Sequence, residues 1–150
     1  MWAMQTGDQV PDFEATDQHG TTHTLSSLLA EGPIVLFFYP KAMTPGCTAE
    51  SCHFRDLKGD LAAIGTRPVG ISSDSVAKQK EFDDRHDLGF TLLSDQGGKI
   101  AKIFGTKRPL VAMARRHTFV IDTDRTVKAV IRSEMNMETH ADKAIAALSA

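Results

Sequence analysis

The sequence is poor in cysteine and lacks a long apolar run. Two of its 150 residues are cysteine, Cys47 and Cys52. Its longest uninterrupted apolar segment, Ile34 to Tyr39, is far too short to span a bilayer. The first residues also lack the basic region and following apolar stretch of a secretory signal. Together these absences predict a cytoplasmic protein with no membrane partner.

The sequence also lacks an excess of charge of either sign. Its formal net charge of -2 gives no basic footprint for a nucleic acid, so we expect no nucleic-acid partner. Apolar residues make up 41% and charged residues 24% of the chain, which is ordinary for a globular protein. No repeat, low-complexity tract or linker divides the sequence. We therefore expect residues 1–150 to form a single domain.

The two cysteines are either incidental or chemically active. A structural disulfide is not expected in a reducing compartment, and a core of this size does not need one. Residues five positions apart on an α-helix have Cα atoms about 8.7 Å apart, whereas a disulfide tolerates at most about 7 Å. If Cys47 and Cys52 form a redox pair on one helix, its first turn must therefore unwind in each cycle.

Turn residues and apolar patterns predict alternating strands and helices. Ile34–Tyr39 is apolar on both faces, as in a central strand covered on both sides. A turn at Asp17–Gly20 indicates a β-hairpin within Pro11–Leu25. The other expected elements are a helix over Cys47–Leu61, a strand at 68–72, a helix capped by Ser73 or Ser75 and ending at Gly89, a strand at 92–93, a helix around 100–104, paired strands at 117–121 and 126–131, and a helix from about Thr139. This order predicts an α/β, thioredoxin-like fold, with a mixed central β-sheet flanked by helices and an N-terminal β-hairpin.

The segment from Tyr39 to Cys52 carries the chemistry. Cys47 is expected in the first turn of a helix, where backbone N–H groups without intrahelical partners favour a thiolate. An ordinary thiol is only ~3% ionised at pH 7, and a helix N-terminus alone contributes about 1 kcal/mol. A cation and a hydroxyl are needed as well. The candidates are Arg116, Arg115 and the Thr44 hydroxyl.

The same segment resembles the active site of a known enzyme family. Pro40-x-x-x-Thr44-x-x-Cys47 is similar to the peroxiredoxin signature. The longer string Thr-Pro-Gly-Cys-Thr-x-Glu-x-Cys resembles the peroxiredoxin Q subfamily, also called bacterioferritin comigratory protein. The likeness extends along nearly the whole chain, including the opening Gly-Asp-x-x-Pro-Asp-Phe and the later Arg-x-Thr-Phe-Val-Ile-Asp.

The resemblance implies a role for each matching residue. Cys47 corresponds to the peroxidatic cysteine, and Thr44 to the residue whose hydroxyl contacts the peroxide. Pro40 corresponds to the residue that shields the thiolate from water, and Arg116 to the arginine that holds thiolate and peroxide. Cys52 corresponds to the resolving cysteine of members that carry both thiols on one helix.

Glu50 has two interpretations. The resemblance implies that it orients the arginine, whereas the residues alone favour a first-turn carboxylate that interacts with the helix dipole. The chain departs from the family at Met43, where an acidic residue is common, and at Ser51, where alanine is common. The adjacent Arg115 leaves the register of the arginine ambiguous.

The implied activity is that of a thiol-dependent peroxidase. Hydrogen peroxide and organic hydroperoxides would oxidise Cys47 to a sulfenic acid, and Cys52 would resolve it as an intramolecular disulfide that thioredoxin reduces. The resemblance implies no metal, flavin or haem, and a monomer or weak homodimer. His53 beside Cys52 lacks a second pair of ligands at metal-binding spacing, so no metal site is expected.

Other functions remain open. The alternative for Cys47 is an inert, buried cysteine that packs as a small apolar residue. Cys52 could be a packed thiol, which would make the protein a one-cysteine enzyme. The chain could also be a general disulfide reductase, although that role normally uses Cys-x-x-Cys, or a redox sensor whose output is an altered surface.

Overall fold

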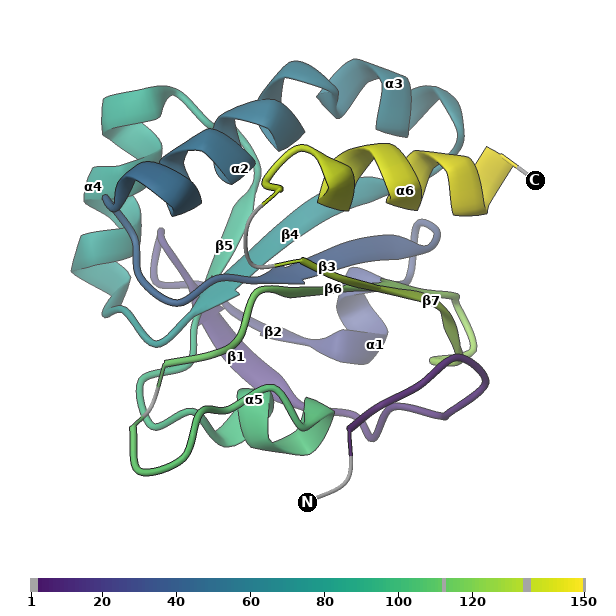
Figure 1. Cartoon of the computed structure of the whole chain (residues 1–150), viewed down its shortest axis with the longest axis horizontal. Coiled ribbons are helices and arrows are strands. Elements are labelled where there is room, and N and C mark those ends of the chain that lie inside the picture. Colours follow the sequence, from purple (N-terminus) through teal and green to yellow (C-terminus); the bar gives the residue numbers. More distant parts are fainter. Residues whose placement is uncertain (1–2, 112, 134–135, 150) are drawn as a thin grey trace.

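A seven-stranded mixed β-sheet forms the centre of the molecule (Figure 1). The computed structural model describes residues 3–111, 113–133 and 136–149. The strand order is β2-β1-β5-β4-β3-β6-β7, with β3, β4 and β5 parallel to one another and the other pairings antiparallel. The strands are β1 (Glu14–Asp17), β2 (Thr22–Thr24), β3 (Ile34–Phe38), β4 (Arg67–Ser72), β5 (Thr91–Ser94), β6 (His117–Ile121) and β7 (Val127–Arg132).

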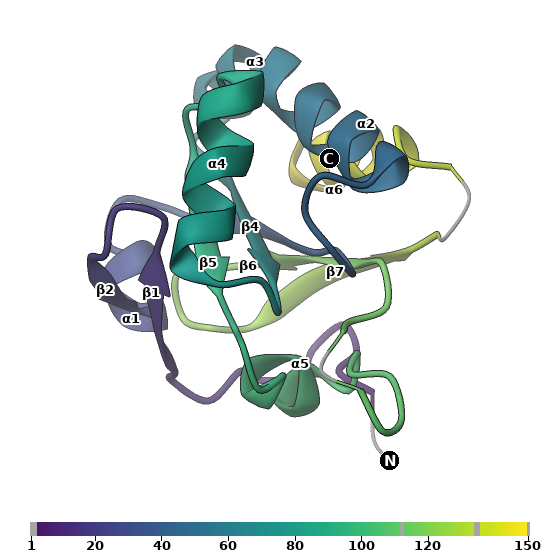
Figure 2. The same ribbon diagram turned by 90° about the vertical axis from the view of Figure 1, so that its left-hand side faces the viewer.

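Helices cover both faces of the sheet (Figures 1 and 2). The helices are α1 (Leu25–Leu28), α2 (Pro45–Asp56), α3 (Lys58–Ala63), α4 (Val76–His86), α5 (Lys99–Phe104) and α6 (Thr139–Ser149). One core cluster joins the sheet to α2, α3, α4 and α6, and a second joins its other face to α1 and α5. No helix in the described ranges is long and apolar enough to cross a membrane.

Strand β3 separates these two cores. Every residue of β3 is buried. Val35 and Phe37 belong to the core under α2, whereas Leu36 and Phe38 belong to the core over α5. Side chains alternate across a strand, so a continuous apolar run supplies both faces at once. The prediction of a thioredoxin-like fold with a doubly covered central strand is confirmed.

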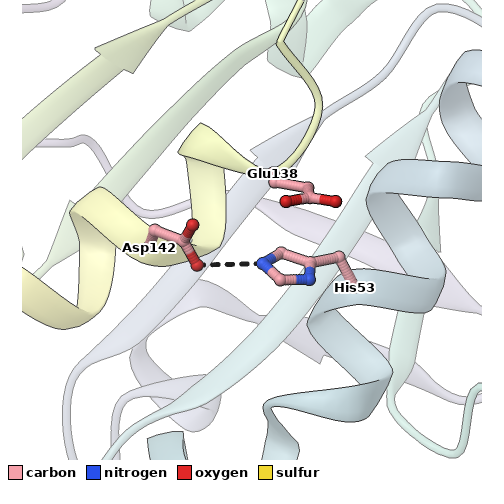
Figure 3. Close-up of side chains that lie close together, drawn as sticks. All are labelled: His53, Glu138 and Asp142. Atoms are coloured by element: carbon pink, nitrogen blue, oxygen red, sulfur yellow. Dashed lines mark hydrogen bonds and ion pairs between the residues drawn. The ribbon is translucent and has the colours of Figure 1, made fainter.

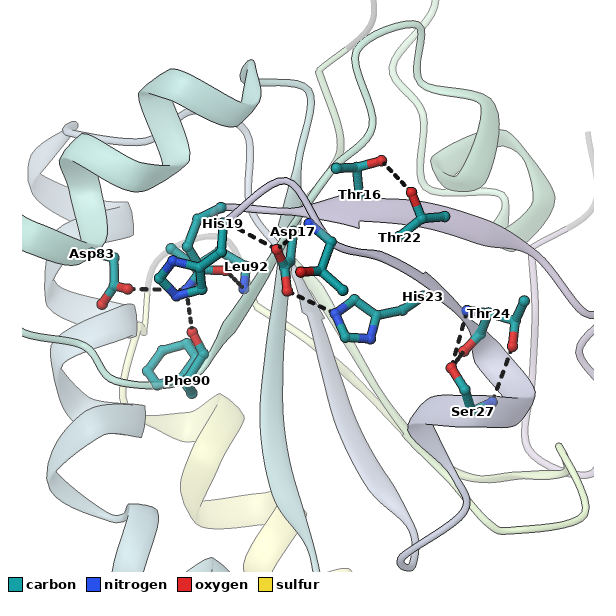
Figure 4. A network of polar contacts seen from close by, with 12 residues as sticks. Thr16, Asp17, His19, Thr22, His23, Thr24, Ser27, Asp83, Phe90 and Leu92 are labelled. Atoms are coloured by element: carbon teal, nitrogen blue, oxygen red, sulfur yellow. Dashed lines mark hydrogen bonds and ion pairs between the residues drawn. The ribbon is translucent and has the colours of Figure 1, made fainter.

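The predicted N-terminal hairpin is confirmed, and a buried carboxylate organises its turn (Figure 4). Asp17 Oδ1 accepts hydrogen bonds from the backbone N–H groups of His19 and Thr21, at 2.8 and 3.0 Å. Asp17 Oδ2 lies 2.7 Å from Nε2 of His23. His23 is therefore a structural partner of the turn. The short helix α1, which the sequence did not predict, follows the hairpin with Thr24 as its N-cap.

Two of the predicted helices have different boundaries in the structure. The expected helix over Cys47–Leu61 begins two residues earlier, at Pro45, and is divided into α2 and α3 at Leu57. Proline is favoured in a first helical turn because its missing N–H would have no partner there. Helix α4 ends before Gly89, because Asp87 already adopts a left-handed conformation with a φ of 49°. Its N-cap is Ser75, one of the two predicted candidates.

Candidate active site

Cys47 lies where β3 leads through a loop into α2. Thr44 is the N-cap of α2, Pro45 occupies its first turn, and Cys47 follows two positions later. The first backbone bond back into this turn joins the Thr48 N–H to the Thr44 carbonyl, at 2.9 Å. The N–H groups before Thr48 point out of the helix end, and their dipoles favour a negative charge on Cys47. Cys47 itself is completely buried.

Arg116 reaches Cys47 from the segment before β6. Its Nη2 donates to the Cys47 Sγ at 3.5 Å, and its Nη1 donates to Oε1 of Glu50 at 2.8 Å. Burial disfavours the charged guanidinium, but the negative charges of Cys47 and Glu50 outweigh this effect and raise the pKa of Arg116 above its ordinary value. One buried guanidinium is thus held between the carboxylate and the thiol, with a fork geometry that suits two acceptors.

Gly46 makes room for this guanidinium. A Cβ added at Gly46 would lie 3.2 Å from Nη2 of Arg116, tighter than an ordinary contact. Because Nη2 is the atom that faces Cys47, any side chain here would displace the group that contacts the thiol. The glycine between the proline and the cysteine therefore serves the site through its lack of a side chain.

A chain of buried polar groups supports Glu50 from behind. Nε2 of His140, on α6, lies 3.6 Å from Oε2 of Glu50. The same nitrogen is 2.8 Å from the Ser133 carbonyl, which can only accept, so Nε2 carries a proton. Nδ1 of His140 lies 2.7 Å from the Thr118 hydroxyl. These contacts tie the arginine–carboxylate pair to α6 and β6.

A second network fixes the loop between β3 and α2. The Ala42 N–H donates to Oδ2 of Asp74 at 2.7 Å, and the Ser72 hydroxyl donates to the same oxygen at 2.7 Å. The Tyr39 hydroxyl donates to Oε1 of Gln79 at 2.6 Å. Burial raises the pKa of Tyr39 well above its ordinary value despite hydrogen bonds that oppose the shift, so this phenol stays neutral.

Thr44 and Pro40 lie in this loop but play different structural parts. The Thr44 hydroxyl donates its single proton to the Lys41 carbonyl at 2.8 Å. That proton is therefore not directed at Cys47, contrary to the expectation that Thr44 donates to the thiolate. Pro40 is half-buried at the end of the central strand. Met43 has a φ of 69°, a conformation that costs energy for a residue with a long side chain.

The structure shows which of the two arginines contacts Cys47, and it places Glu50 beyond the first turn of α2. Arg116 is buried beside Cys47, whereas Arg115 is exposed and lines a separate cavity on the α5 side with Lys102 and Lys107. Glu50 is not a first-turn carboxylate, because α2 begins at Pro45 and places it further along the helix. Its contact with Arg116 agrees with the alternative implied by the family resemblance.

Cys52 lies on the same continuous helix as Cys47. It is half-buried, and both thiols are free. Helix α2 is unbroken from Pro45 to Asp56, so its geometry keeps the two Cα atoms about 8.7 Å apart. The structure therefore represents a reduced arrangement from which a disulfide requires local unwinding.

Sequence reasoning did not assign Gly46 or His140 to this site. Gly46 could have been suspected, because a glycine inside a helical turn next to a reactive cysteine needs a reason. His140 gave no such signal, since it is separated from Glu50 by most of the chain and sits in an ordinary helical pattern.

Fold and site together define a class of protein: thioredoxin-like proteins with a buried thiol in the first turn of a helix, beside a buried arginine. The AhpC/TSA family model matches residues 6–130. The chain thus belongs to the AhpC/TSA family of peroxiredoxins, and it is similar to members of the Q, or bacterioferritin comigratory protein, type.

Three comparisons support this assignment. The relative Rv1608c of Mycobacterium tuberculosis, which is named as a peroxiredoxin, is 55% identical to this chain over 150 residues. The alignment covers 98% of this chain and 97% of the relative. The crystal structure of peroxidoxin BcpB from Mycobacterium tuberculosis has a TM-score of 0.94 at 54% identity and 97% coverage of both chains. A bacterioferritin comigratory protein from Xanthomonas campestris has a TM-score of 0.82 at 28% identity, covering 91% of this chain and 90% of that one.

Proposed function

We propose that this protein is a two-cysteine peroxidase in which Cys47 attacks the peroxide, Cys52 resolves the product and thioredoxin restores both thiols. The observation that carries the proposal is the contact of Arg116 Nη2 with the Cys47 Sγ at 3.5 Å. Glu50 holds the same guanidinium at 2.8 Å. A cation fixed beside a thiol at a helix N-terminus stabilises the thiolate, which is the nucleophilic form.

The first step is displacement on the O–O bond of the peroxide. The Cys47 thiolate forms an S–O bond with one oxygen, and the other oxygen leaves with the electron pair and takes a proton to become water or an alcohol. Arg116 and the N–H groups of the first α2 turn stabilise the charge that develops on the oxygens. The Thr44 hydroxyl already donates its proton to the Lys41 carbonyl. Its oxygen lone pairs therefore accept a hydrogen bond from the peroxide. Cys47 becomes a sulfenic acid.

The second step forms a disulfide within the same chain. The first turn of α2 unwinds, the Cys52 thiol attacks the Cys47 sulfenic acid, and water leaves. A thiolate of reduced thioredoxin then attacks the disulfide, and its second thiol completes the exchange. Cys47 and Cys52 return to free thiols, and the two cysteines of thioredoxin are oxidised to a disulfide. The glycine in the first turn of α2 favours this local unwinding, because glycine lowers the stability of a helix.

The substrates proposed are hydrogen peroxide and organic hydroperoxides. Cys47 is completely buried, so the loop from Pro40 to Thr44 or the first turn of α2 must shift to admit a peroxide. The Xanthomonas campestris relative is described as having alkyl peroxide reduction activity. We carry that substrate class to this chain because both belong to the same family. Pro40, at the exit of the central strand, shields the thiolate from water.

We also propose that one chain suffices for the cycle. Cys47 and Cys52 lie on the same helix, and Arg116 and Glu50 complete the site from the same chain. Residues 1–150 would then act as a single domain, as a monomer in the cytoplasm. Light scattering during size-exclusion chromatography checks the oligomeric state, and an obligate dimer at assay concentrations would contradict it.

Peroxide consumption tests the central proposal. Wild type, Cys47→Ser and Cys52→Ser are assayed with thioredoxin, thioredoxin reductase and NADPH. We expect no activity from Cys47→Ser, and one fast turnover followed by arrest from Cys52→Ser. Peroxide consumption that persists in Cys47→Ser would refute the assignment of the nucleophile. Undiminished turnover in Cys52→Ser would make Cys52 a packed thiol and the protein a one-cysteine enzyme.

A further inference from the structure

Three metal-ligating side chains converge between α2 and α6, away from the thiol site (Figure 3). His53 projects from α2, next to Cys52 in the sequence. Asp142 lies on α6, and Glu138 directly precedes that helix. One ligand atom from each of the three lies within 4.8 Å of the others, and Nε2 of His53 is 2.9 Å from Oδ1 of Asp142.

The backbone accounts for this convergence. Glu138 and Asp142 are four residues apart, a spacing that puts both carboxylates on one side of a helix. His53 faces them from α2, which runs beside α6 (Figures 1 and 3). Two carboxylates are thus gathered around one imidazole, where their mutual repulsion favours a positive charge between them.

The spacing of residues around His53 predicted no metal site, because Glu138 and Asp142 lie far from His53 in the sequence. From the geometry we propose instead that these three residues form a binding site for a divalent transition-metal ion, with Zn²⁺ as its best fit. An imidazole nitrogen with two carboxylate oxygens is a donor set that zinc accepts, with water as a fourth ligand. Tetrahedral ligands of zinc lie about 3.4 Å from one another, a value between the 2.9 Å separation of His53 from Asp142 and the 4.8 Å limit of the cluster, so small side-chain rotations suffice to reach it. Ca²⁺ requires more oxygen ligands than this site supplies.

The ion would clamp the helix that has to unwind. Cys52 is adjacent to His53 on α2. In this clamp, the unwinding that begins in the first turn of α2 extends to Cys52 and thereby moves His53 out of the ligand set. This consequence rests on the proposed function, in which Cys52 resolves the Cys47 sulfenic acid. If zinc binds only while α2 is intact, the unwound fraction falls by a factor of 1 + [Zn²⁺]/Kd. At ten times Kd, disulfide formation slows about 11-fold.

Binding is measured first and without the thiols, which are zinc ligands themselves. Isothermal titration of Cys47→Ser/Cys52→Ser with Zn²⁺ should give one ion per chain, and Ca²⁺ should not compete. Adding His53→Ala should weaken zinc binding at least tenfold. His19→Ala is the matched control, because it removes an exposed histidine outside the cluster. Absence of binding up to about 1 mM Zn²⁺, or equal affinity with and without His53, overturns the site.

The clamp is tested by the rate of disulfide formation after one equivalent of peroxide. Zinc should slow this step in wild type about 11-fold at ten times Kd, and much less in His53→Ala, whose remaining response reports zinc on the thiols. Equal slowing in the two proteins overturns the clamp. Zinc binding is measured on a variant without thiols. A negative result for the metal site is therefore distinguishable from a negative result for disulfide formation between Cys47 and Cys52.

Discussion

The two adjacent arginines allow a sharp test of the proposed thiolate partner. Arg116→Lys keeps the positive charge but replaces a two-pronged donor by a single ammonium. Arg116 now contacts Glu50 with Nη1 and Cys47 with Nη2. One ammonium cannot occupy both positions, and the buried carboxylate is the stronger competitor for it. We expect the lysine to stay with Glu50 and to withdraw from the sulfur.

The magnitude follows from the distances. At 3.5 Å and an effective dielectric constant of about 20, a unit charge pair interacts by about 5 kcal/mol. If the ammonium withdraws from the sulfur by about 2 Å, the interaction falls to about 3 kcal/mol. The loss of about 2 kcal/mol corresponds to a roughly 30-fold slower reaction with peroxide.

Stopped-flow measurement of Cys47 oxidation by hydrogen peroxide at pH 7 gives this rate constant. Arg115→Lys is the control, because Arg115 is exposed and lines another cavity. It should react within about twofold of wild type, since an exposed charge is largely screened. A wild-type rate in Arg116→Lys, or an equal loss of rate in Arg115→Lys, would contradict this role of Arg116.

Three further substitutions test other parts of the structure. Gly46→Ala places a Cβ 3.2 Å from Arg116 Nη2, so peroxide oxidation should slow about tenfold, while thermal unfolding shows equal or higher stability because alanine favours a helix by about 1 kcal/mol. The pKa of Asp17 is lowered, because hydrogen bonds from His23 and backbone N–H groups outweigh the opposing effect of burial. Its carboxylate stabilises the fold above the ordinary pKa and loses this contribution as pH falls through the folded pKa. Urea unfolding should therefore find Asp17→Asn less stable by about 1 kcal/mol at pH 7, with the gap closing below about pH 4. Tyr39→Phe removes the 2.6 Å donor of a buried amide oxygen and should cost about 1–3 kcal/mol in the same assay.

Each of these expectations has a contrary result. A Gly46→Ala protein that reacts at the wild-type rate would show that the guanidinium can move without loss. A stability gap for Asp17→Asn that persists unchanged at pH 3 would show that the charge of Asp17 is not its source. Unchanged stability of Tyr39→Phe would mean that the amide finds another donor.

The order of strands and helices could be predicted because it depends on local patterns. The apolar run of β3, the turn at Asp17–Gly20 and the capping serine of α4 each act within a few residues. The errors concern helix boundaries and one very short helix. Helix α2 starts at Pro45 and ends at Asp56, although the helical apolar spacing continues through Leu61. The short α1 has too few residues to produce a periodic signal.

The family could be identified from the sequence alone, and the same motif singled out Cys47 as the proposed reactive thiol. The Pro-x-x-x-Thr-x-x-Cys string and the helix that follows are contiguous, and contiguous residues carry their own local geometry. The packing of the fold was needed to show that Arg116 and not Arg115 contacts Cys47, that Glu50 holds this arginine, and that His53 faces α6. Those contacts join segments far apart in the chain. Their geometry depends on how strands and helices pack, because a one-residue change of register turns a side chain to the opposite face.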